Sequence, residues 1–145
     1  MQKLLTAAFI ALTLVGCTSV LMGNAKQDAA LKVFTVPADR SGIYVYRIGS
    51  ILGAMVKMDV TVDGTFIGQT ASNTYLYKEV TPGKHTVTSK AENTDSIDIE
   101  AMPGTLIYLR QEVQMGILYA RNKLRLVDEV AGKKGITETT LAETK

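Results

Sequence analysis

The pattern of hydrophobic and polar positions along the chain changes near residue 33. Upstream, an apolar run from Leu4 to Val15 is followed by a mostly polar segment. Downstream, apolar and polar positions alternate; in Val56–Val62 every even-numbered residue is apolar and the residues between are polar. A period of two residues is typical of strands that bury one face. The pattern therefore predicts an N-terminal leader followed by a domain built from strands.

Eight segments of the body have the composition of strands. They are Gly42–Ile48, Val56–Val62, Thr65–Gly68, Tyr75–Val80, Lys84–Ser89, Ile97–Ala101, Thr105–Gln114 and Leu118–Val130, with a break near residues 115–116 or 120–122. Asp63-Gly64 favours a type I′ hairpin and Pro82-Gly83 a tight turn. No helical stripe is long enough for a crossover helix. The pattern therefore predicts an all-β fold, a single antiparallel β-sandwich or small barrel.

The same features divide the 145-residue chain into four parts. Residues 1–16 are the leader, and residues 17–32 are expected to be a tether in which a short helix forms near Asp28–Lys32. Residues 33–136 are the predicted sandwich, and residues 137–145 are expected to be a tail or a short helix. A chain of this length suits one domain with its own core.

The leader, MQKLLTAAFIALTLVG, has the plan of a secretory signal, with a positive charge at Lys3 and then an apolar run too short to cross a bilayer as a helix. The sequence Leu14-Val15-Gly16-Cys17 resembles the lipobox of bacterial lipoproteins. That resemblance implies cleavage between Gly16 and Cys17, with a diacylglyceryl group on the sulfur and an acyl chain on the new N-terminus. The alternatives are an ordinary cleaved signal and an apolar N-terminal helix of a cytosolic protein.

The residue after the cysteine bears on the location of such a lipoprotein. In Gram-negative lipoproteins an aspartate at this place signals retention in the inner membrane, and here the residue is Thr18. The resemblance therefore implies the bacterial cell envelope and, in a Gram-negative organism, the outer membrane facing the periplasm.

Four segments of the body carry a shared pattern of turn and core residues. They read IYVYR at Ile43–Arg47, GAMVKMDVTVDGTFIG at Gly53–Gly68, YLYKEVTPGKHTV at Tyr75–Val87 and GTLIYLRQEV at Gly104–Val113. Here the chain resembles a group of small bacterial envelope lipoproteins with a β-sandwich domain of unknown function. The VDG, IG and PGKHTV portion is also similar to PEGA-type domains, so a PEGA-like or immunoglobulin-like sandwich is expected. The resemblance implies no known reaction.

Charge and residue content limit the chemistry that the chain can carry. The formal net charge of +2 is too balanced for the concentrated basic surface that nucleic-acid binding favours. The single cysteine, Cys17, serves the anchor and the single histidine is His85, so no catalytic triad or zinc set is recognisable. Asp95, Asp98 and Glu100 fit the solvent face of a strand better than a calcium site. We expect no catalytic residue, no metal site and no cofactor apart from the covalent lipid.

One candidate contact surface is the apolar connection Gly49–Ala54, which contains Ile51 and Leu52. Apolar loops that are exposed tend to mark contact sites. The alternative, which we favour from the sequence, is that Ile51, Leu52 and Met55 fold back and cap the open end of the sandwich.

A second candidate is a basic run. Arg121, Lys123 and Arg125 share one side if this segment is a strand, with Arg110 on a neighbouring strand. Such a stripe can meet anionic lipid headgroups or cell-wall polymer. The alternative is an ordinary solvated face.

Together these features predict a lipid-anchored, non-catalytic binding or adaptor module for another envelope component, for which an exposed sheet edge is one route of pairing. One alternative is a module that binds cell-wall glycan or a small amphiphile, which a pocket ringed by tyrosine hydroxyls would favour. The alternating Tyr44, Tyr46, Tyr75 and Tyr77 otherwise predict packed rings whose hydroxyls reach a partner or water. A hydrolase with an unrecognised site is the remaining alternative.

Overall fold

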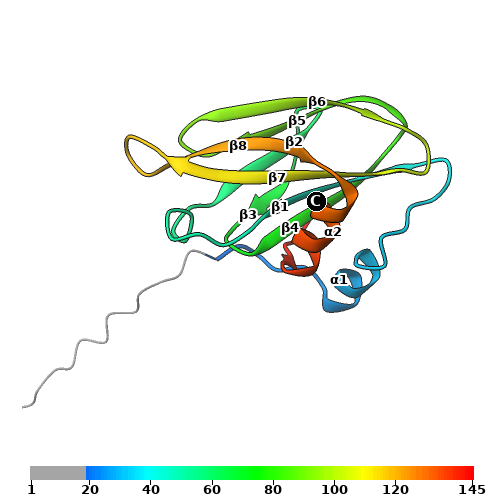
Figure 1. Cartoon of the computed structure of the whole chain (residues 1–145), viewed down its shortest axis with the longest axis horizontal. Helices are drawn as coiled ribbons and strands as arrows, with labels where there is room; N and C mark the ends of the chain where they lie inside the picture. Colours follow the sequence, from blue (N-terminus) through cyan, green and yellow to red (C-terminus); the bar gives the residue numbers. More distant parts are fainter. Residues whose placement is uncertain (1–18) are drawn as a thin grey trace, which may run out of the picture.

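The computed structural model describes residues 19–145, which form two helices and nine strands. The helices are α1 (Ala25–Leu31) and α2 (Glu129–Thr137), and the strands are β1 (Ser41–Arg47), β2 (Met58–Val62), β3 (Thr65–Thr70), β4 (Thr74–Val80), β5 (Gly83–Lys90), β6 (Thr94–Ala101), β7 (Leu106–Met115), β8 (Ala120–Val127) and β9 (Thr140–Leu141). Each of the eight predicted strand segments contains a strand. Figure 1 shows stacked sheets with both helices on one side.

The strands form two sheets, which confirms the predicted β-sandwich. The five-stranded sheet has the order β8-β7-β1-β4-β9 and the four-stranded sheet the order β3-β2-β5-β6. The four-stranded sheet is antiparallel, as expected. The five-stranded sheet is mixed, because β1 pairs in parallel with β7 and β4 pairs in parallel with β9. Parallel neighbours need a long connection, and the chain between β1 and β7 supplies it by building β4 and the whole four-stranded sheet.

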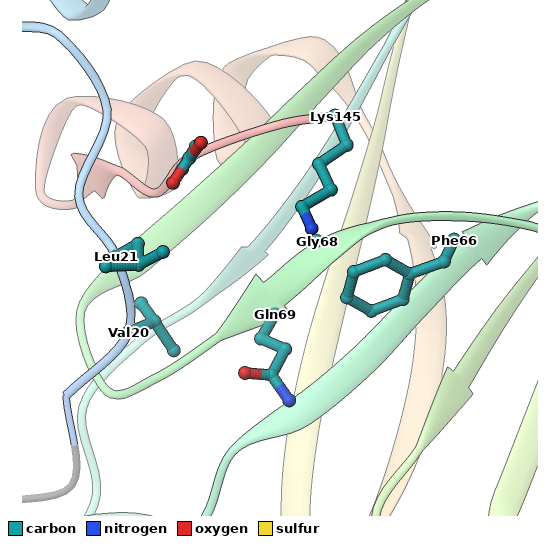
Figure 2. Close-up of a pocket in the computed structure, with 7 residues that line it drawn as sticks. Val20, Leu21, Phe66, Gly68, Gln69 and Lys145 are labelled. Atoms are coloured by element: carbon teal, nitrogen blue, oxygen red, sulfur yellow. The ribbon is translucent and has the colours of Figure 1, made fainter.

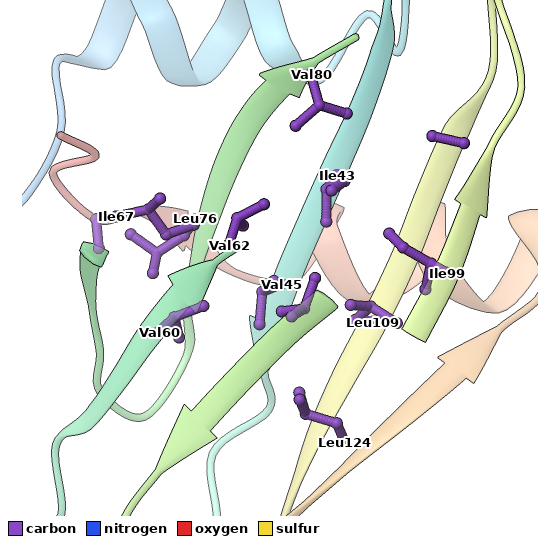
Figure 3. Close-up of a cluster of buried hydrophobic side chains, with 13 residues drawn as sticks. Ile43, Val45, Val60, Val62, Ile67, Leu76, Val80, Ile99, Leu109 and Leu124 are labelled. Carbon is purple, nitrogen blue, oxygen red and sulfur yellow. The ribbon is translucent and has the colours of Figure 1, made fainter. Parts of the chain in front are cut away.

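Aliphatic side chains from both sheets fill the space between them. The predicted alternation in β2 is present, since Met58, Val60 and Val62 are buried whereas Asp59 and Thr61 are only partly buried. Figure 3 shows side chains of the two sheets meeting in this layer. Met58 belongs to a smaller cluster with Val56 and Ala120. The main cluster contains Val60 and Val62 together with Ile43, Val45, Ile67, Leu76, Val80, Val87, Ile99, Ala101, Leu109, Leu124 and Ala142. Removal of this apolar surface from water is the main driving force for folding.

The outer face of the five-stranded sheet carries a layer of tyrosines beneath the helices. Tyr44, Tyr46, Tyr75 and Tyr108 are buried, and the rings of Tyr44 and Tyr108 stack with centroids 5.4 Å apart. The Tyr44 hydroxyl donates a hydrogen bond of 2.6 Å to the carbonyl of Leu31 at the end of α1. The predicted packing of alternating tyrosines is confirmed, and β1 is buried on both of its faces.

Asp28 of α1 joins the N-terminal segment to the sheet. Its carboxylate accepts hydrogen bonds from the Tyr75 hydroxyl (2.7 Å), the Leu141 N–H (3.1 Å) and the Lys32 ammonium (3.0 Å). Burial acts to raise the pKa of Asp28, but these hydrogen bonds outweigh it and the pKa is lowered. The sequence predicts a tether over residues 17–32 with a short helix near Asp28–Lys32. In the structure a helix is present here, α1, and it covers the buried tyrosines and supplies acceptors for the Tyr44 and Tyr75 hydroxyls.

Helix α2 begins where the sequence predicts the end of a strand. The predicted strand Leu118–Val130 ends at Val127, and the Asp128 side chain then accepts a hydrogen bond of 2.8 Å from the Ala131 N–H. An aspartate before a helix satisfies an N–H that has no partner within the helix. The predicted tail at residues 137–145 also differs, because it returns to the sheet as β9 beside β4.

Two glycines let α2 lie directly on the tyrosine rings. Gly132 and Gly135 are both buried. A Cβ atom at Gly132 would overlap the ring of Tyr108, and a Cβ atom at Gly135 would overlap the ring of Tyr46. Glycine is a poor helix former, so packing against the tyrosine layer, rather than local propensity, stabilises this helix.

Gly135→Ala should destabilise the protein, although alanine favours an exposed helix over glycine by about 1 kcal/mol. The added methyl group must displace the Tyr46 ring, and such overpacking costs about 1–3 kcal/mol. The midpoint of thermal unfolding should therefore fall by several degrees. Lys134→Ala, at an exposed position of the same helix, is the matched control and should barely move it. A Gly135→Ala protein as stable as wild type would contradict the close approach.

Candidate functional site

Two apolar loops meet at one end of the sandwich. They are the β1–β2 connection, residues 48–57, and the β7–β8 hairpin loop, residues 116–119; Figure 1 shows both at the left end of the longest axis. A hollow of about 480 Å³ lies between them, lined by Leu52, Met55, Val56, Lys57 and Tyr119. We call the exposed apolar residues of the two loops the apolar end surface. Its members are Ile51, Leu52, Met55, Ile117, Leu118 and Tyr119.

The apolar end surface faces solvent. The exposed fraction is 97% for Ile51, 45% for Leu52, 90% for Ile117 and 83% for Leu118. The sequence-based expectation that Ile51 and Leu52 fold back as a cap is therefore wrong. Val56 is buried instead, at 7% exposed, and closes this end of the core. Contact of Ile51 and Leu52 with a partner stays a prediction. Their side chains are exposed, as such contact requires.

A buried arginine is hydrogen-bonded to the backbone of the first loop. Arg47 is 0% exposed, and its Nη2 donates hydrogen bonds to the carbonyls of Gly53 (3.2 Å) and Val56 (2.6 Å). Within the described part of the chain, its Nε and Nη1 have no hydrogen-bond partner. Burial lowers the pKa of Arg47 to about 10, so the side chain remains charged at neutral pH. The loop is thus fixed by charge-assisted hydrogen bonds, which are stronger than neutral ones.

The core near this end is polar. Gln111 accepts a hydrogen bond from the Thr70 hydroxyl (2.6 Å) and donates one to the Ser89 hydroxyl (2.7 Å), and all three side chains are buried. Gln111 directly follows Arg110, the β7 partner of Tyr46, so it is level with Arg47 on the neighbouring strand. The hydrophobic pattern did not predict this polar interior, although the alternation of IYVYR places Arg47 in phase with two buried residues.

A carboxylate holds the second loop. Glu92, in the β5–β6 turn, accepts hydrogen bonds from the N–H groups of Ile117 (2.8 Å), Leu118 (3.2 Å) and Tyr119 (3.1 Å). These bonds, led by that of Tyr119, lower the pKa of Glu92. A Cβ atom at Gly116 would overlap the same carboxylate. Because these residues are about 25 positions apart in sequence, no local signal could reveal the contact.

The predicted basic residues share one side of β8, as expected, since Arg121, Lys123 and Arg125 are all exposed. Lys123 pairs with Asp95 at 3.4 Å, and Arg125 pairs with Glu112 at 2.7 Å. Carboxylates therefore pair with two of these three cations, and the exposed Arg110 lies opposite Arg125 on β7, as expected. Arg121 lies next to the hairpin loop. A role for these residues in contact with lipid or cell-wall polymer stays a prediction.

Side chains from the other sheet cover part of the outer edge of β8. The Asn122 N–H donates to Asn93 Oδ1 at 2.7 Å, and the Leu124 N–H donates to Asp95 Oδ2 at 2.7 Å. Edge N–H groups that are already bonded cannot template another strand. Pairing through this sheet edge is therefore disfavoured.

The lone histidine lies at the opposite end, between two turns. His85 Nδ1 lies 2.6 Å from Asp63 Oδ2, and its Nε2 lies 2.7 Å from the Thr81 carbonyl oxygen. Because both partners are acceptors, both ring nitrogens are donors, as in the protonated imidazole. Burial acts to lower the pKa of His85, but the two hydrogen bonds outweigh it and the pKa is raised. In this state His85 has no nitrogen available as a general base.

Two of the carboxylates singled out in the sequence, Asp98 and Glu100, line a hollow of about 470 Å³ with Asp63 and His85, whereas Asp95 is bonded to β8. Asp98 is exposed and accepts a hydrogen bond of 2.7 Å from the Thr86 hydroxyl, and Glu100 is exposed. Within residues 19–145, no cluster of three or more His, Cys, Asp or Glu side chains could hold a metal ion.

Among the same residues, no helix is long and apolar enough to cross a membrane. The predicted cleavage and lipidation residues, Gly16 and Cys17, lie outside the described residues.

Arg47→Met should loosen residues 48–57 without unfolding the domain. Methionine keeps the buried side chain apolar but cannot donate to the Gly53 and Val56 carbonyls. Loss of hydrogen bonds from a charged donor, about 1.5–3 kcal/mol, should speed amide hydrogen exchange in the loop about tenfold or more. Arg121→Met removes an exposed arginine and is the control. Unchanged exchange in Arg47→Met would show that the arginine does not hold the loop.

The hydrogen bonds of His85 to Asp63 and to the Thr81 carbonyl should make the stability of the fold depend on pH. The pKa of His85 is raised in the folded protein. The stabilisation by His85 is therefore fully present below its pKa in the unfolded chain, about 6.5, and is lost as the pH rises through its pKa in the folded protein. Because Asp63 is half exposed, this amounts to at most about 1 kcal/mol, or about 2–4 °C in the thermal midpoint. The advantage of wild type over His85→Gln should therefore shrink between about pH 6 and pH 9. A difference in thermal midpoint that grows with pH would contradict hydrogen bonding by a protonated His85.

Comparisons with known proteins place the chain in a family. Residues 37–122 match the family model DUF2846, described as a protein of unknown function. A protein of Haemophilus influenzae, named only as an uncharacterized protein, is 31% identical over 135 residues, which cover 92% of this chain and 80% of the relative. Neither name assigns a reaction or a ligand. The matched range extends into β8 and includes both apolar loops, and on these grounds the chain belongs to the DUF2846 family of proteins of unknown function.

Proposed function

We propose that this protein is a lipid-anchored component of the bacterial cell envelope that acts by binding another envelope component, without covalent chemistry. The lipobox-like sequence ending in Gly16-Cys17 supports the anchor. The bacterial relative is consistent with it, and so is the likeness of the VDG to PGKHTV portion to PEGA-type envelope domains. Thr18 in place of aspartate supports the outer membrane, facing the periplasm, in a Gram-negative organism.

The observation that carries the proposal is that the folded domain begins directly after the expected anchor. Val20 packs against the core between the sheets, and the Leu21 carbonyl accepts a hydrogen bond of 2.8 Å from the Glu143 N–H. Figure 2 shows Val20 and Leu21 beside β3, around a hollow of about 270 Å³. Two peptide units span at most about 7 Å, so a lipid on Cys17 would hold the domain directly at the membrane surface.

The described residues favour binding over catalysis. Both nitrogens of His85 are engaged, so the chain offers no free imidazole for acid–base work. The most unusual exposed feature is the apolar end surface, and large exposed apolar patches mark interaction sites. Neither comparison indicates a reaction. The partner classes are another envelope protein or cell-wall polymer, contacted through surface side chains rather than through the edge of β8.

A glycan or amphiphile pocket built from tyrosines receives less support. The Tyr44 hydroxyl is bonded to the Leu31 carbonyl, and the Tyr75 hydroxyl is bonded to Asp28. Both rings are buried under the helices. Among the described residues, these tyrosines therefore present no open, hydroxyl-ringed pocket, and the surface-binding role is the better supported of the two.

Cys17→Ala should abolish the lipid anchor. In cells fed an alkyne-tagged fatty acid, the wild-type protein should be labelled and should fractionate with membranes, because several acyl chains together give stable anchoring. The variant should lose the label and most of its membrane association. Thr18→Ala keeps the sulfur and should be labelled normally. A Cys17→Ala protein that still incorporates the fatty acid would refute the anchor.

A further inference from the structure

We infer that the apolar end surface lies on the lipid bilayer, so that the two loops insert their apolar side chains into the membrane interface and fix the orientation of the domain. This inference rests on the proposed lipid anchor and adds to it a second, non-covalent contact with the same membrane. Four observations carry it: the exposure of the loops, the place where the chain enters the domain, the surrounding charge and the satisfied backbone of the hairpin.

The loops have the composition and exposure of an interfacial membrane contact. Ile51, Ile117 and Leu118 are each more than four-fifths exposed, and Tyr119 is 52% exposed. Leu and Tyr are favoured where protein meets the acyl–headgroup boundary, Tyr because one end of its ring is apolar and the other polar. Leu52 and Met55 of the first loop and Tyr119 of the second line one hollow, so the two loops present adjacent apolar side chains.

The chain enters the domain at the same end. In Figure 1 the described chain begins at the left end of the longest axis, where both loops lie. In Figure 2, Val20 lies beside Gln69 near the end of β3, which is this end of the sandwich. Since Cys17 is at most about 7 Å from Ser19 along the chain, its lipid tethers this end to the bilayer. A membrane held here meets the loops first.

The charges also favour this orientation. Lys57, Lys90 and Arg121 lie in or next to the end loops and are exposed. Among the carboxylates near these residues, Asp59 accepts a hydrogen bond from Gln69, Glu92 accepts from the hairpin N–H groups and faces Arg121, and Asp95 pairs with Lys123. At the opposite end Asp63 pairs with His85 and Glu129 pairs with Lys133, which leaves Asp39, Glu100 and Asp128 exposed beside Lys84. Anionic headgroups attract basic residues near the surface, so Lys57, Lys90 and Arg121 favour the loop end as the end that faces the bilayer.

Three backbone N–H groups of the hairpin loop are already hydrogen-bonded. An N–H group that leaves water without a partner is strongly unfavourable in lipid. The N–H groups of Ile117, Leu118 and Tyr119 already have an acceptor in Glu92. Insertion of these side chains therefore does not leave these three backbone donors unsatisfied.

A single tryptophan tests the inference, because the chain contains none. Leu118→Trp places the probe in the apolar end surface, and Met102→Trp, at a position 58% exposed near the opposite end, is the matched control. The full-length mature protein is purified from bacterial membranes with its acyl groups and reconstituted in vesicles of phosphatidylethanolamine and phosphatidylglycerol with brominated acyl chains. Emission from the Leu118→Trp protein should shift to the blue and be quenched about twofold or more, as expected at interfacial depth. Emission from the Met102→Trp protein should resemble that of tryptophan in water.

Ile51→Trp repeats the test on the other loop, at a position whose exposure leaves room for the larger ring. If the Ile51→Trp and Leu118→Trp proteins stay unquenched while they remain on the vesicles, the inference is overturned but the anchor is intact; a partner other than lipid then faces the loops. Quenching of Met102→Trp equal to that of Leu118→Trp also overturns it. Loss of acyl groups from Cys17 by intact mass, or failure of the protein to float with the vesicles, overturns the proposed function and the inference together.

Discussion

Burial of β1 on both faces is the constraint on which the rest of the structure depends. Ile43 and Val45 face the four-stranded sheet, and Tyr44 and Tyr46 face the helices. Tyrosine rings bring a large apolar surface and a hydroxyl that needs a partner when buried. The sandwich alone covers only one face of this strand. A second cover is therefore required, and α1 and α2 provide it, which makes the molecule three layers deep at β1.

The need to cover the tyrosines ties the N-terminal segment to the fold. Asp28 satisfies the Tyr75 hydroxyl and the Leu141 N–H at once, and Lys32 bridges Asp28 to the Thr139 carbonyl. A segment that is bonded to both the sheet and the C-terminal strand cannot act as a loose linker. A lipid at the proposed anchor would accordingly be coupled to the orientation of the whole domain. The same packing that stabilises β1 would then limit how the domain lies on the proposed membrane.

The sequence predicted what local periodicity encodes. Alternation, β-branched and aromatic composition and turn signals together located the eight long strands, and Asp63-Gly64 located the first hairpin. Helix α2 was missed because its glycines lower helix propensity, and the helix is favoured only by contact with tyrosines from distant strands. The mixed order of the five-stranded sheet was missed for a similar reason, since strand pairing between β1 and β7 is not local.

In the candidate site, too, local sequence predicted some features, and features that depend on contacts between distant segments were missed. The sequence singled out Ile51 and Leu52 but assigned them to a cap, because periodicity cannot tell whether an apolar loop folds inward. The hairpin residues Ile117 and Leu118 were assigned to a strand or its break. Glu92, which holds them, gave no signal, because its role depends on a turn from the other sheet. Arg47 alone could have been found, since it stands in phase with buried neighbours.

The two end loops differ from ordinary loops in what holds them. A loop anchored by its own apolar side chains must turn those side chains inward, as the capping hypothesis assumed. Here a guanidinium below the first loop and a carboxylate beside the second bond to backbone groups. Polar anchoring of the backbone releases the apolar side chains from a structural role and lets Ile51, Ile117 and Leu118 point outward. A buried arginine with unpaired nitrogens is unfavourable by itself, and among the described residues its hydrogen-bond partners are the Gly53 and Val56 carbonyls, so the position of the first loop and the burial of Arg47 depend on each other.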